Sequence, residues 1–225
     1  MSGRFGISRR VFIAGMPLAL AGCQTARMEG RPVVAALPHV DPYYAEMYGP
    51  LDDGRFTVAA MDVSRIDREW LRQRVDYDGP ERPGTVVVDP DGRHLYLVGD
   101  DGTAMRYGIG VGREGFAWSG SAVIRRKAVW PTWTPPAAMV ARDERAREWA
   151  SGMPGGPENP LGARALYLYQ GDRDTLYRIH GTSEPWSIGQ AVSSGCIRLF
   201  NHDIIDLHRR VPTGTRVVVM PSTGV

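Results

Sequence analysis

The stretch TVVVDPDGRHLYLV, residues 85–98, decides the fold class. Two runs rich in β-branched and aromatic residues, 85–88 and 94–98, are separated by DPDG at 89–92. Proline presets a negative φ and glycine supplies a positive φ, so this tetrapeptide favours a tight turn between two strands. The stretch therefore predicts a β-hairpin.

Similar runs elsewhere predict a chain dominated by strands. They lie at 55–60, 104–111, 121–130, 165–169, 175–179 and 215–220. Short helices are expected at 67–73, 141–149 and 201–211. The last of these begins at Asn201, a residue type that favours the N-cap position. Many short strands and few short helices are typical of a mainly β, sandwich- or barrel-like domain.

The composition is that of an ordinary globular protein of 225 residues, with 43% hydrophobic and 23% charged residues. A formal charge of +2 gives no reason to expect nucleic acid as a partner. The two cysteines, Cys23 and Cys196, are too few for a disulfide framework or a four-cysteine zinc site. His202 and His208 lie six positions apart on a predicted helix and face different sides, so we expect no metal.

A glycine-rich run at 110–115 matches the pattern G-x-G-x-x-G. A dinucleotide site needs this loop to open a helix, whereas a strand is predicted to follow here at 121–130. We therefore expect a glycine-rich loop and no nucleotide cofactor.

Residues 1–22 have the features of an export signal. A basic start with RR at 9–10 precedes an apolar core at 11–20, which is too short for a membrane span. The paired arginines resemble a twin-arginine signal, and LAGC at 20–23 resembles the lipobox of bacterial lipoproteins. This resemblance implies lipidation of Cys23, anchoring to a membrane and a position facing the periplasm. The alternative is an ordinary cleaved signal with a chance cysteine.

The rest of the chain divides into a tether with an N-terminal extension, residues 23–83, and a strand-rich domain, residues 84–221. Proline, glycine and aspartate are frequent between residues 24 and 55, as in an irregular lead-in. With Cys23 lipidated, Cys196 is the one remaining thiol in an oxidising compartment. An idle exposed thiol is a liability there, so a chemical role is favoured.

Cys196 lies in the run SSGCIRL, residues 193–199. The small residues before it let backbone N–H groups approach a ligand, although a small cysteine buried in a core is the plainer interpretation. His180 follows the predicted strand 175–179, a rigid place for a catalytic side chain. An imidazole can take the proton of a thiol and later protonate a leaving group. Spacing alone allows the two to meet but does not require it.

The residues around both side chains resemble the L,D-transpeptidases with a YkuD-type catalytic domain. Three motifs occur in order: HGT at 180–182, SIG at 187–189 and GCIRL at 195–199. The run PGGPENPLG at 154–162 adds to the likeness, which covers about residues 84–221.

The resemblance implies a mechanism. Cys196 attacks the carbonyl between the third residue, a diamino acid, and the terminal D-Ala of a peptidoglycan stem tetrapeptide. His180, oriented by the carbonyl of Gly181, protonates the departing D-Ala. An amine then attacks the thioester, so the expected partners are stem peptides.

The resemblance also implies binding roles. Backbone N–H groups around Gly195 would hold the oxyanion. Many members carry histidine where this chain has Ser194, which bears on the tuning of that pocket. Arg198 is a candidate contact for stem carboxylates, or forms a structural salt bridge. Trp186 and Tyr169 either line the groove or pack.

Three functions are open at this point. The first is transfer of the acyl group between stem peptides, which cross-links them. The second is transfer to, or hydrolysis from, an amine of an envelope protein by the same site. The third is a lipoprotein that binds peptidoglycan without chemistry, and the intact pair of His180 and Cys196 argues against it.

Overall fold

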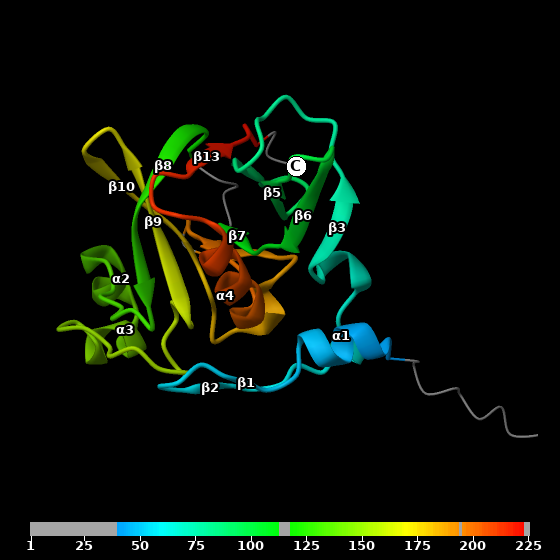
Figure 1. The fold of residues 1–225 in the computed structure, drawn as a ribbon. Helices are drawn as coiled ribbons and strands as arrows, with labels where there is room; N and C mark the ends of the chain where they lie inside the picture. Colours follow the sequence, from blue (N-terminus) through cyan, green and yellow to red (C-terminus); the bar gives the residue numbers. More distant parts are fainter. Residues whose placement is uncertain (1–39, 113–117, 194, 223–225) are drawn as a thin grey trace, which may run out of the picture. The chain divides into compact units, whose positions relative to one another are not determined.

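A mixed β-sheet organises the computed structural model, which describes residues 40–112, 118–193 and 195–222 (Figure 1). Within these residues, nine strands form one sheet in the order β12-β10-β9-β8-β13-β4-β5-β6-β3. They are β3 (Gln73–Asp76), β4 (Val86–Asp89), β5 (His94–Val98), β6 (Thr103–Gly108), β8 (Gly120–Val129), β9 (Arg164–Gln170), β10 (Arg173–His180), β12 (Ile197–Arg198) and β13 (Arg216–Val219). The prediction of a mainly β domain is confirmed.

Short elements complete the described fold. Two small sheets pair β1 (Leu51–Asp52) with β2 (Thr57–Val58), and β7 (Val111–Gly112) with β11 (Ala191–Ser193). The α-helices are α1 (Pro42–Met47), α2 (Ala137–Arg142), α3 (Glu144–Glu148) and α4 (Asn201–Arg210). Single 3₁₀ turns are η1 (Val63–Arg65), η2 (Arg68–Trp70) and η3 (Pro185–Ser187). The helices are few and short, as predicted.

The stretch at 85–98 forms the predicted hairpin. Strands β4 and β5 are antiparallel, with Asp89 opposite His94. The carboxylate of Asp89 accepts the backbone N–H of Gly92 at 2.9 Å, and Arg93 takes a φ of 53° to close the turn. Local turn chemistry therefore sets the register of this half of the sheet.

Two expected helices differ from the structure. Residues 67–73 hold only the turn η2, because Gln73 already begins β3 and pairs with the edge of β6. The helix expected at 141–149 is divided into α2 and α3 at Asp143. The carboxylate of Asp143 accepts two N–H groups of the first turn of α3, so this residue caps a new helix rather than continuing one.

The N-terminal strap, defined as residues 40–76, is more regular than expected, because the residues up to 55 were expected to be irregular and instead contain α1 and β1. Helix α1 begins at Pro42, and the side chain of Asp41 accepts the N–H of Tyr43 as its cap. Strands β1 and β2 form a hairpin, and β3 joins the main sheet beside β6. The strap therefore shares a sheet with the strands expected to carry the chemistry.

The signal-like residues 1–22 and Cys23 lie outside the described residues. Export, lipidation and the division at residues 23–83 and 84–221 therefore stay predictions. Among the residues that the structure describes, no helix has both the length and the apolar character needed to cross a bilayer.

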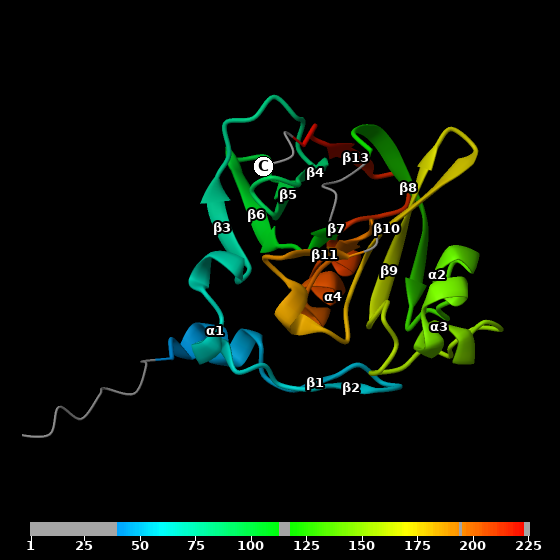
Figure 2. The same ribbon diagram turned by 180° about the vertical axis from the view of Figure 1, so that it is seen from behind.

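Helix α4 packs against the sheet. Ile204 and Leu207 of α4 belong to one buried cluster with Leu166 of β9 and Ile179 of β10. Figures 1 and 2 show α4 between the β8–β9–β10 end and the β5–β6–β3 end of the sheet. Burial of this apolar stripe fixes α4 relative to β9 and β10, the strands beside the candidate site.

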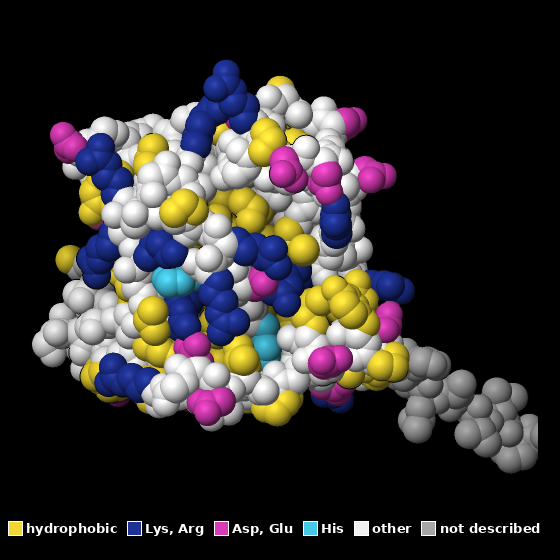
Figure 3. Space-filling view, viewed as in Figure 1, with side chains coloured by type: hydrophobic (Ala, Val, Ile, Leu, Met, Phe, Trp, Pro, Cys, Tyr) yellow, Lys and Arg dark blue, Asp and Glu magenta, His cyan; other side chains and the backbone are white. Residues whose placement is uncertain are grey.

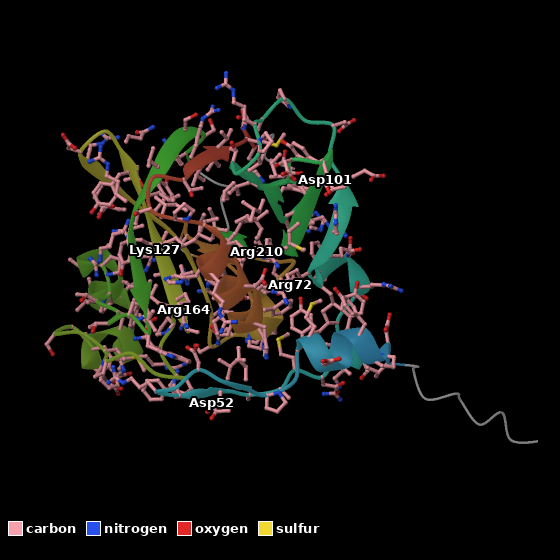
Figure 4. All side chains as sticks on the ribbon, viewed as in Figure 1. Asp52, Arg72, Asp101, Lys127, Arg164 and Arg210 are labelled. Carbon is pink, nitrogen blue, oxygen red and sulfur yellow. The ribbon has the colours of Figure 1, made fainter. Side chains whose placement is uncertain are left out.

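Basic side chains gather near the centre of the surface shown in Figure 3, where Figure 1 places α4. Figure 4 places Arg72 and Arg210 on one side of α4 and Lys127 on the other. Both arginines contact the carboxylate of Asp206, and Lys127 Nζ donates to two carbonyls at the end of α4. These three cations thus have partners inside the protein, and Lys127 lies at the end of α4 where the helix dipole favours a positive charge.

Candidate active site

The pairing of β10 with β12 builds the site. The two strands are parallel, with Ile179 opposite Ile197 and His180 opposite Arg198. Cys196 directly precedes β12, and the backbone N–H of Arg178 donates to its sulfur. His180 and Arg198 lie opposite each other and so share a face of the sheet, and the hydrogen bond from Arg178 holds the sulfur of Cys196 beside β10. His180 and Cys196, which are sixteen positions apart in the sequence, are thereby brought to neighbouring strands.

His180 is buried, with 4% of its surface exposed. Its Nδ1 lies 2.5 Å from the carbonyl oxygen of Gly181, which makes Nδ1 the donor and leaves Nε2 as the basic nitrogen. Burial lowers the pKa of His180 to about 4, with a further lowering from Arg198 and Arg178, although the Gly181 carbonyl opposes it. The imidazole is therefore neutral at neutral pH and able to accept a proton.

The surroundings of Cys196 also favour its neutral form, the thiol. Burial raises the pKa of the thiol, while the Arg178 N–H and the guanidinium groups of Arg178 and Arg198 oppose that shift. The resting pair is thus a thiol and a neutral imidazole rather than a preformed ion pair. The chemistry that fits is attack by sulfur with simultaneous transfer of its proton to His180.

Gly195 precedes Cys196 in a backbone conformation that other residues rarely adopt. Its φ is +121°, whereas an added Cβ would meet the ring of Tyr177 at an ordinary 3.7 Å. The conformation rather than the space therefore requires glycine here. This turn directs the chain into Cys196 and explains why glycine directly precedes it.

Asn201 clamps the loop that contains Gly181. Its Oδ1 accepts the N–H groups of Ala163 and Thr182 at 3.0 and 3.2 Å, and its Nδ2 donates to the carbonyl of Thr182. A Cβ on Gly181 would lie 2.2 Å from that Oδ1. The prediction of Asn201 as N-cap is wrong, because Phe200 takes the cap position and the amide serves these longer-range bonds.

Two arginine–carboxylate pairs flank the thiol. On the β10 side, Arg178 contacts Asp174 at 2.6 and 2.7 Å. On the β12 side, Arg198 Nη1 lies 2.8 Å from Glu184 Oε2. Arg198 thus forms the salt bridge that was one of its two expected roles, without excluding the other.

No group of three His, Cys, Asp or Glu side chains able to hold a metal occurs among the described residues. In the glycine-rich run at 110–115, Val111 and Gly112 form β7, which pairs with β11. Residues 113–117 lie outside the described residues, and the next described element is the strand β8.

The family described as YkuD, L,D-transpeptidase catalytic domain, matches residues 83–219. The chain belongs to this family. A curated relative is the probable L,D-transpeptidase YbiS of Escherichia coli (strain K12), 40% identical over 139 residues. The match covers 60% of this chain and 43% of YbiS, so this chain spans less than half the length of that relative.

Two solved structures are also similar. A chain from Brucella melitensis, described as a probable carnitine operon oxidoreductase, is 48% identical and has a TM-score of 0.48. That match covers 71% of this chain and 99% of the other. The L,D-transpeptidase from Mycobacterium smegmatis is 19% identical with a TM-score of 0.44, covering 61% of this chain and 58% of the other.

The structure describes two of the three remaining residues singled out from the resemblance to L,D-transpeptidases. Trp186 on η3 is 64% exposed. Tyr169 pairs with Asp174 toward the far end of the β9–β10 hairpin, and the register does not bring it beside Cys196. Tyr167 instead pairs with Arg178. Ser194 lies outside the described residues.

Sequence reasoning missed Arg178 and the aromatic pair Trp118–Tyr177. The two rings stack with centroids 5.6 Å apart, and Tyr177 borders Gly195. Alternation along β10 could have signalled Arg178, which stands two residues before His180. The aromatic pair had no local signal, since its members come from distant parts of the chain.

Proposed function

We propose that this protein is a peptidoglycan L,D-transpeptidase that links stem peptides through a Cys196 thioester. The observation that carries the proposal is the β10–β12 register, which puts Cys196 two residues before the partner of His180. Membership of the L,D-transpeptidase family supports the reaction type. The substrates are inferred from the same family, which acts at the cell envelope.

Acylation begins when the sulfur of Cys196 attacks the carbonyl carbon between the diamino acid and the terminal D-Ala of a stem tetrapeptide. The thiol proton passes to Nε2 of His180. Backbone N–H groups around Gly195 stabilise the oxyanion, and one such donor is worth about 3–4 kcal/mol. The C–N bond then breaks, the proton moves from His180 to the departing D-Ala amine, and a thioester remains.

Deacylation reverses these roles. The amine of a second stem peptide attacks the thioester carbonyl and gives its proton to His180 as the new C–N bond forms. The C–S bond breaks, and the proton returns to the sulfur of Cys196. The Gly181 carbonyl keeps Nε2 directed at the reacting atoms in both halves of the reaction.

We further propose that the protein is exported and held at a membrane by lipid on Cys23, so that the catalytic domain faces the periplasm. The lipobox-like LAGC at 20–23 supports this. Cells fed labelled palmitate test it: label on the wild-type protein and none on Cys23→Ala is expected. An unlabelled wild-type protein beside a labelled control lipoprotein would contradict the proposal that lipid on Cys23 anchors the protein.

Mass spectrometry tests the reaction. Incubation with stem tetrapeptide should yield D-Ala and an acyl adduct on Cys196, and a carbapenem should acylate the same residue. The Cys196→Ala variant should yield neither product. Binding of the peptide without any adduct would favour a non-catalytic peptidoglycan-binding lipoprotein. An adduct followed only by hydrolysis would favour a hydrolase.

A further inference from the structure

Strand β10 contains a bulge, defined as residues 174–178, that ends beside the thiol. Asp174 pairs with Tyr169 of β9 and Arg178 pairs with Tyr167, so four steps along β10 lie against two steps along β9. Two residues of β10 are therefore extra at this point. The backbone N–H of Arg178, the last residue of the bulge, donates to the sulfur of Cys196.

Two backbone N–H groups inside the bulge are bound by side chains of the bulge itself. Asp174 Oδ1 accepts the N–H of Leu176 at 2.8 Å, and Thr175 Oγ1 accepts the N–H of Tyr177 at 3.2 Å. The Thr175 hydroxyl also donates to the carbonyl of Leu168 on β9 at 2.7 Å. Because backbone N–H groups need acceptors in a folded chain, these two side chains replace the acceptors that a regular ladder supplies.

The side chain of Arg178 fixes the end of the bulge. Its guanidinium contacts both carboxylate oxygens of Asp174, at 2.6 and 2.7 Å, and donates to the carbonyl of Tyr177 at 2.9 Å. It also lies over the ring of Tyr167, 4.5 Å from the centroid, and Arg126 lies over the same ring at 4.2 Å. A planar guanidinium bound by a carboxylate, a carbonyl and a ring has little freedom to turn. The backbone of Arg178, with its N–H, is therefore held in place.

Leu176 shows that the bulge is strained. Its φ of 65° is a left-handed conformation that bulky residues rarely adopt, and the residue is 75% exposed, so burial does not compensate. Strained residues persist where the surrounding contacts determine them, and they cluster at active sites. This one lies two positions before Arg178, which indicates that the bulge is kept for what it does at its end.

We propose that the bulge is a positioning device for the nucleophile, in which Asp174 and Thr175 direct the backbone N–H of Arg178 at the sulfur of Cys196. The inference rests on the proposed transpeptidase function and adds two positioning residues to its catalytic pair. Neither residue touches the substrate. Both act through the backbone of β10.

A hydrogen bond to the sulfur serves both halves of the reaction. As the thiol proton passes to His180, negative charge develops on the sulfur of Cys196, and the N–H stabilises that charge. The same charge develops when the C–S bond of the thioester breaks and the sulfur leaves. A backbone N–H that is already in place needs no reorganisation at either step. The bond also restricts rotation of the Cys196 side chain, which keeps the sulfur at one position relative to His180.

The variant Asp174→Asn tests the device, because it keeps an acceptor for the N–H of Leu176 but loses the ion pair with Arg178. Two explanations of Asp174 predict opposite signs. If Asp174 positions the N–H, the variant weakens the hydrogen bond to sulfur, and the pKa of Cys196 rises by at least about 0.5. If Asp174 only neutralises Arg178, the uncompensated guanidinium lowers that pKa.

The pH dependence of Cys196 alkylation by iodoacetamide gives the pKa. Mass spectrometry of the peptide that contains Cys196 keeps the measurement specific to this thiol. The charged and titratable groups beside the sulfur are Arg178 and His180 of β10 and Arg198 of β12, and Asp174→Asn leaves all three in the chain. A pKa that falls, or that stays within about 0.5 of the wild-type value, would overturn the inference.

Thr175 supplies a second pair of variants. Thr175→Val keeps the branched shape without the hydroxyl, whereas Thr175→Ser keeps the hydroxyl. Thr175→Val should lower the maximal rate of acylation by the tetrapeptide at least about fivefold, and Asp174→Asn at least about tenfold. The tetrapeptide concentration at half-maximal rate should change less than about twofold, because no substrate contact is lost. Thr175→Ser should restore the rate, and equal losses in both Thr175 variants would contradict a role for the hydroxyl.

The matched control is Asp172→Asn. Asp172 lies on the same hairpin, pairs with Arg125 and is exposed, so its loss removes a carboxylate charge without touching the bulge. Neither the thiol pKa nor the acylation rate should change. A wild-type protein that forms no Cys196 adduct with the tetrapeptide contradicts the transpeptidase function itself. Because alkylation needs no substrate, it decides the role of the bulge separately.

Discussion

Two parts of this protein bury titratable groups, and the buried groups have different roles in the two parts. At the β10–β12 edge, His180 and Cys196 are held as neutral groups between which a proton can move. Between the N-terminal strap and α4, the carboxylate of Asp203 is fully buried but lies within 3.0 Å of the Tyr48 hydroxyl. In the proposed mechanism the first region serves proton transfer, whereas the second makes fixed contacts.

The strap region shows how fixed contacts are made. The Tyr48 hydroxyl also accepts the backbone N–H of Arg72 at 2.6 Å. Asp53 of the strap accepts two bonds from Arg164 and one from the indole of Trp130. Tyr48, Asp53 and Arg72 precede residue 83, where the family match begins, whereas Trp130 and Arg164 lie within the matched region. Against the effect of burial, hydrogen bonds and the charge of Arg164 lower the pKa of Asp53 and keep it charged, whereas His180 and Cys196 have hydrogen-bond partners too but are held in their neutral forms.

The largest expected effect is on the reactive side. Cys196→Ser should lower the rate of D-Ala release at least about 1,000-fold, because a serine hydroxyl is far less acidic than a thiol and His180 is its only base in the proposed mechanism. Steady-state release from a stem tetrapeptide measures it. Turnover near that of the wild type would show that Cys196 is not the nucleophile. The β10–β12 edge would then not differ from the strap region in the way described above.

The next effect is on the structural side. Asp53→Ala leaves Arg164 buried without its carboxylate and should lower the free energy of unfolding by about 3–5 kcal/mol. Asp172→Ala is the matched control: that carboxylate pairs with Arg125 but is 96% exposed, so a loss of about 0–1 kcal/mol is expected. Urea denaturation of both variants decides. Equal losses would mean that the strap is held by apolar packing alone.

Asp203 links the structural region to pH. Burial raises its pKa to about 7, above the ordinary 3.8, so the folded state binds a proton that the unfolded state has lost. This contribution to stability is present below about pH 4 and falls by about 1.4 kcal/mol per pH unit as the pH rises toward 7. Asp203→Asn should remove that slope. Parallel stability profiles for wild type and variant between pH 5 and 6.5 would contradict it.

The comparison also shows what could be predicted from sequence. The hairpin at 85–98 follows from turn chemistry within four residues, and Cys196 and His180 stand in contiguous motifs. Alternation along the strand could have placed Arg178 beside His180, but the pairing of Arg178 with Asp174 spans a bulge that no local pattern encodes. Asn201 has the chemistry of a cap, yet the two loops that it bonds, at 162–163 and 181–182, meet only in the folded chain.

The smallest expected effect sharpens the description of the reactive region. Because burial lowers the pKa of His180 to about 4, about 90% of the imidazole is already neutral at pH 5. An imidazole with the ordinary pKa of 6.5 would be only about 3% neutral there. The rate of Cys196 acylation by the tetrapeptide should therefore change less than about twofold between pH 5 and 7, with circular dichroism confirming the fold at both values. An acylation rate that rises with pH around a midpoint near 6.5 would contradict the prediction. It would show that water reaches His180 and that the imidazole is less buried than the structure indicates.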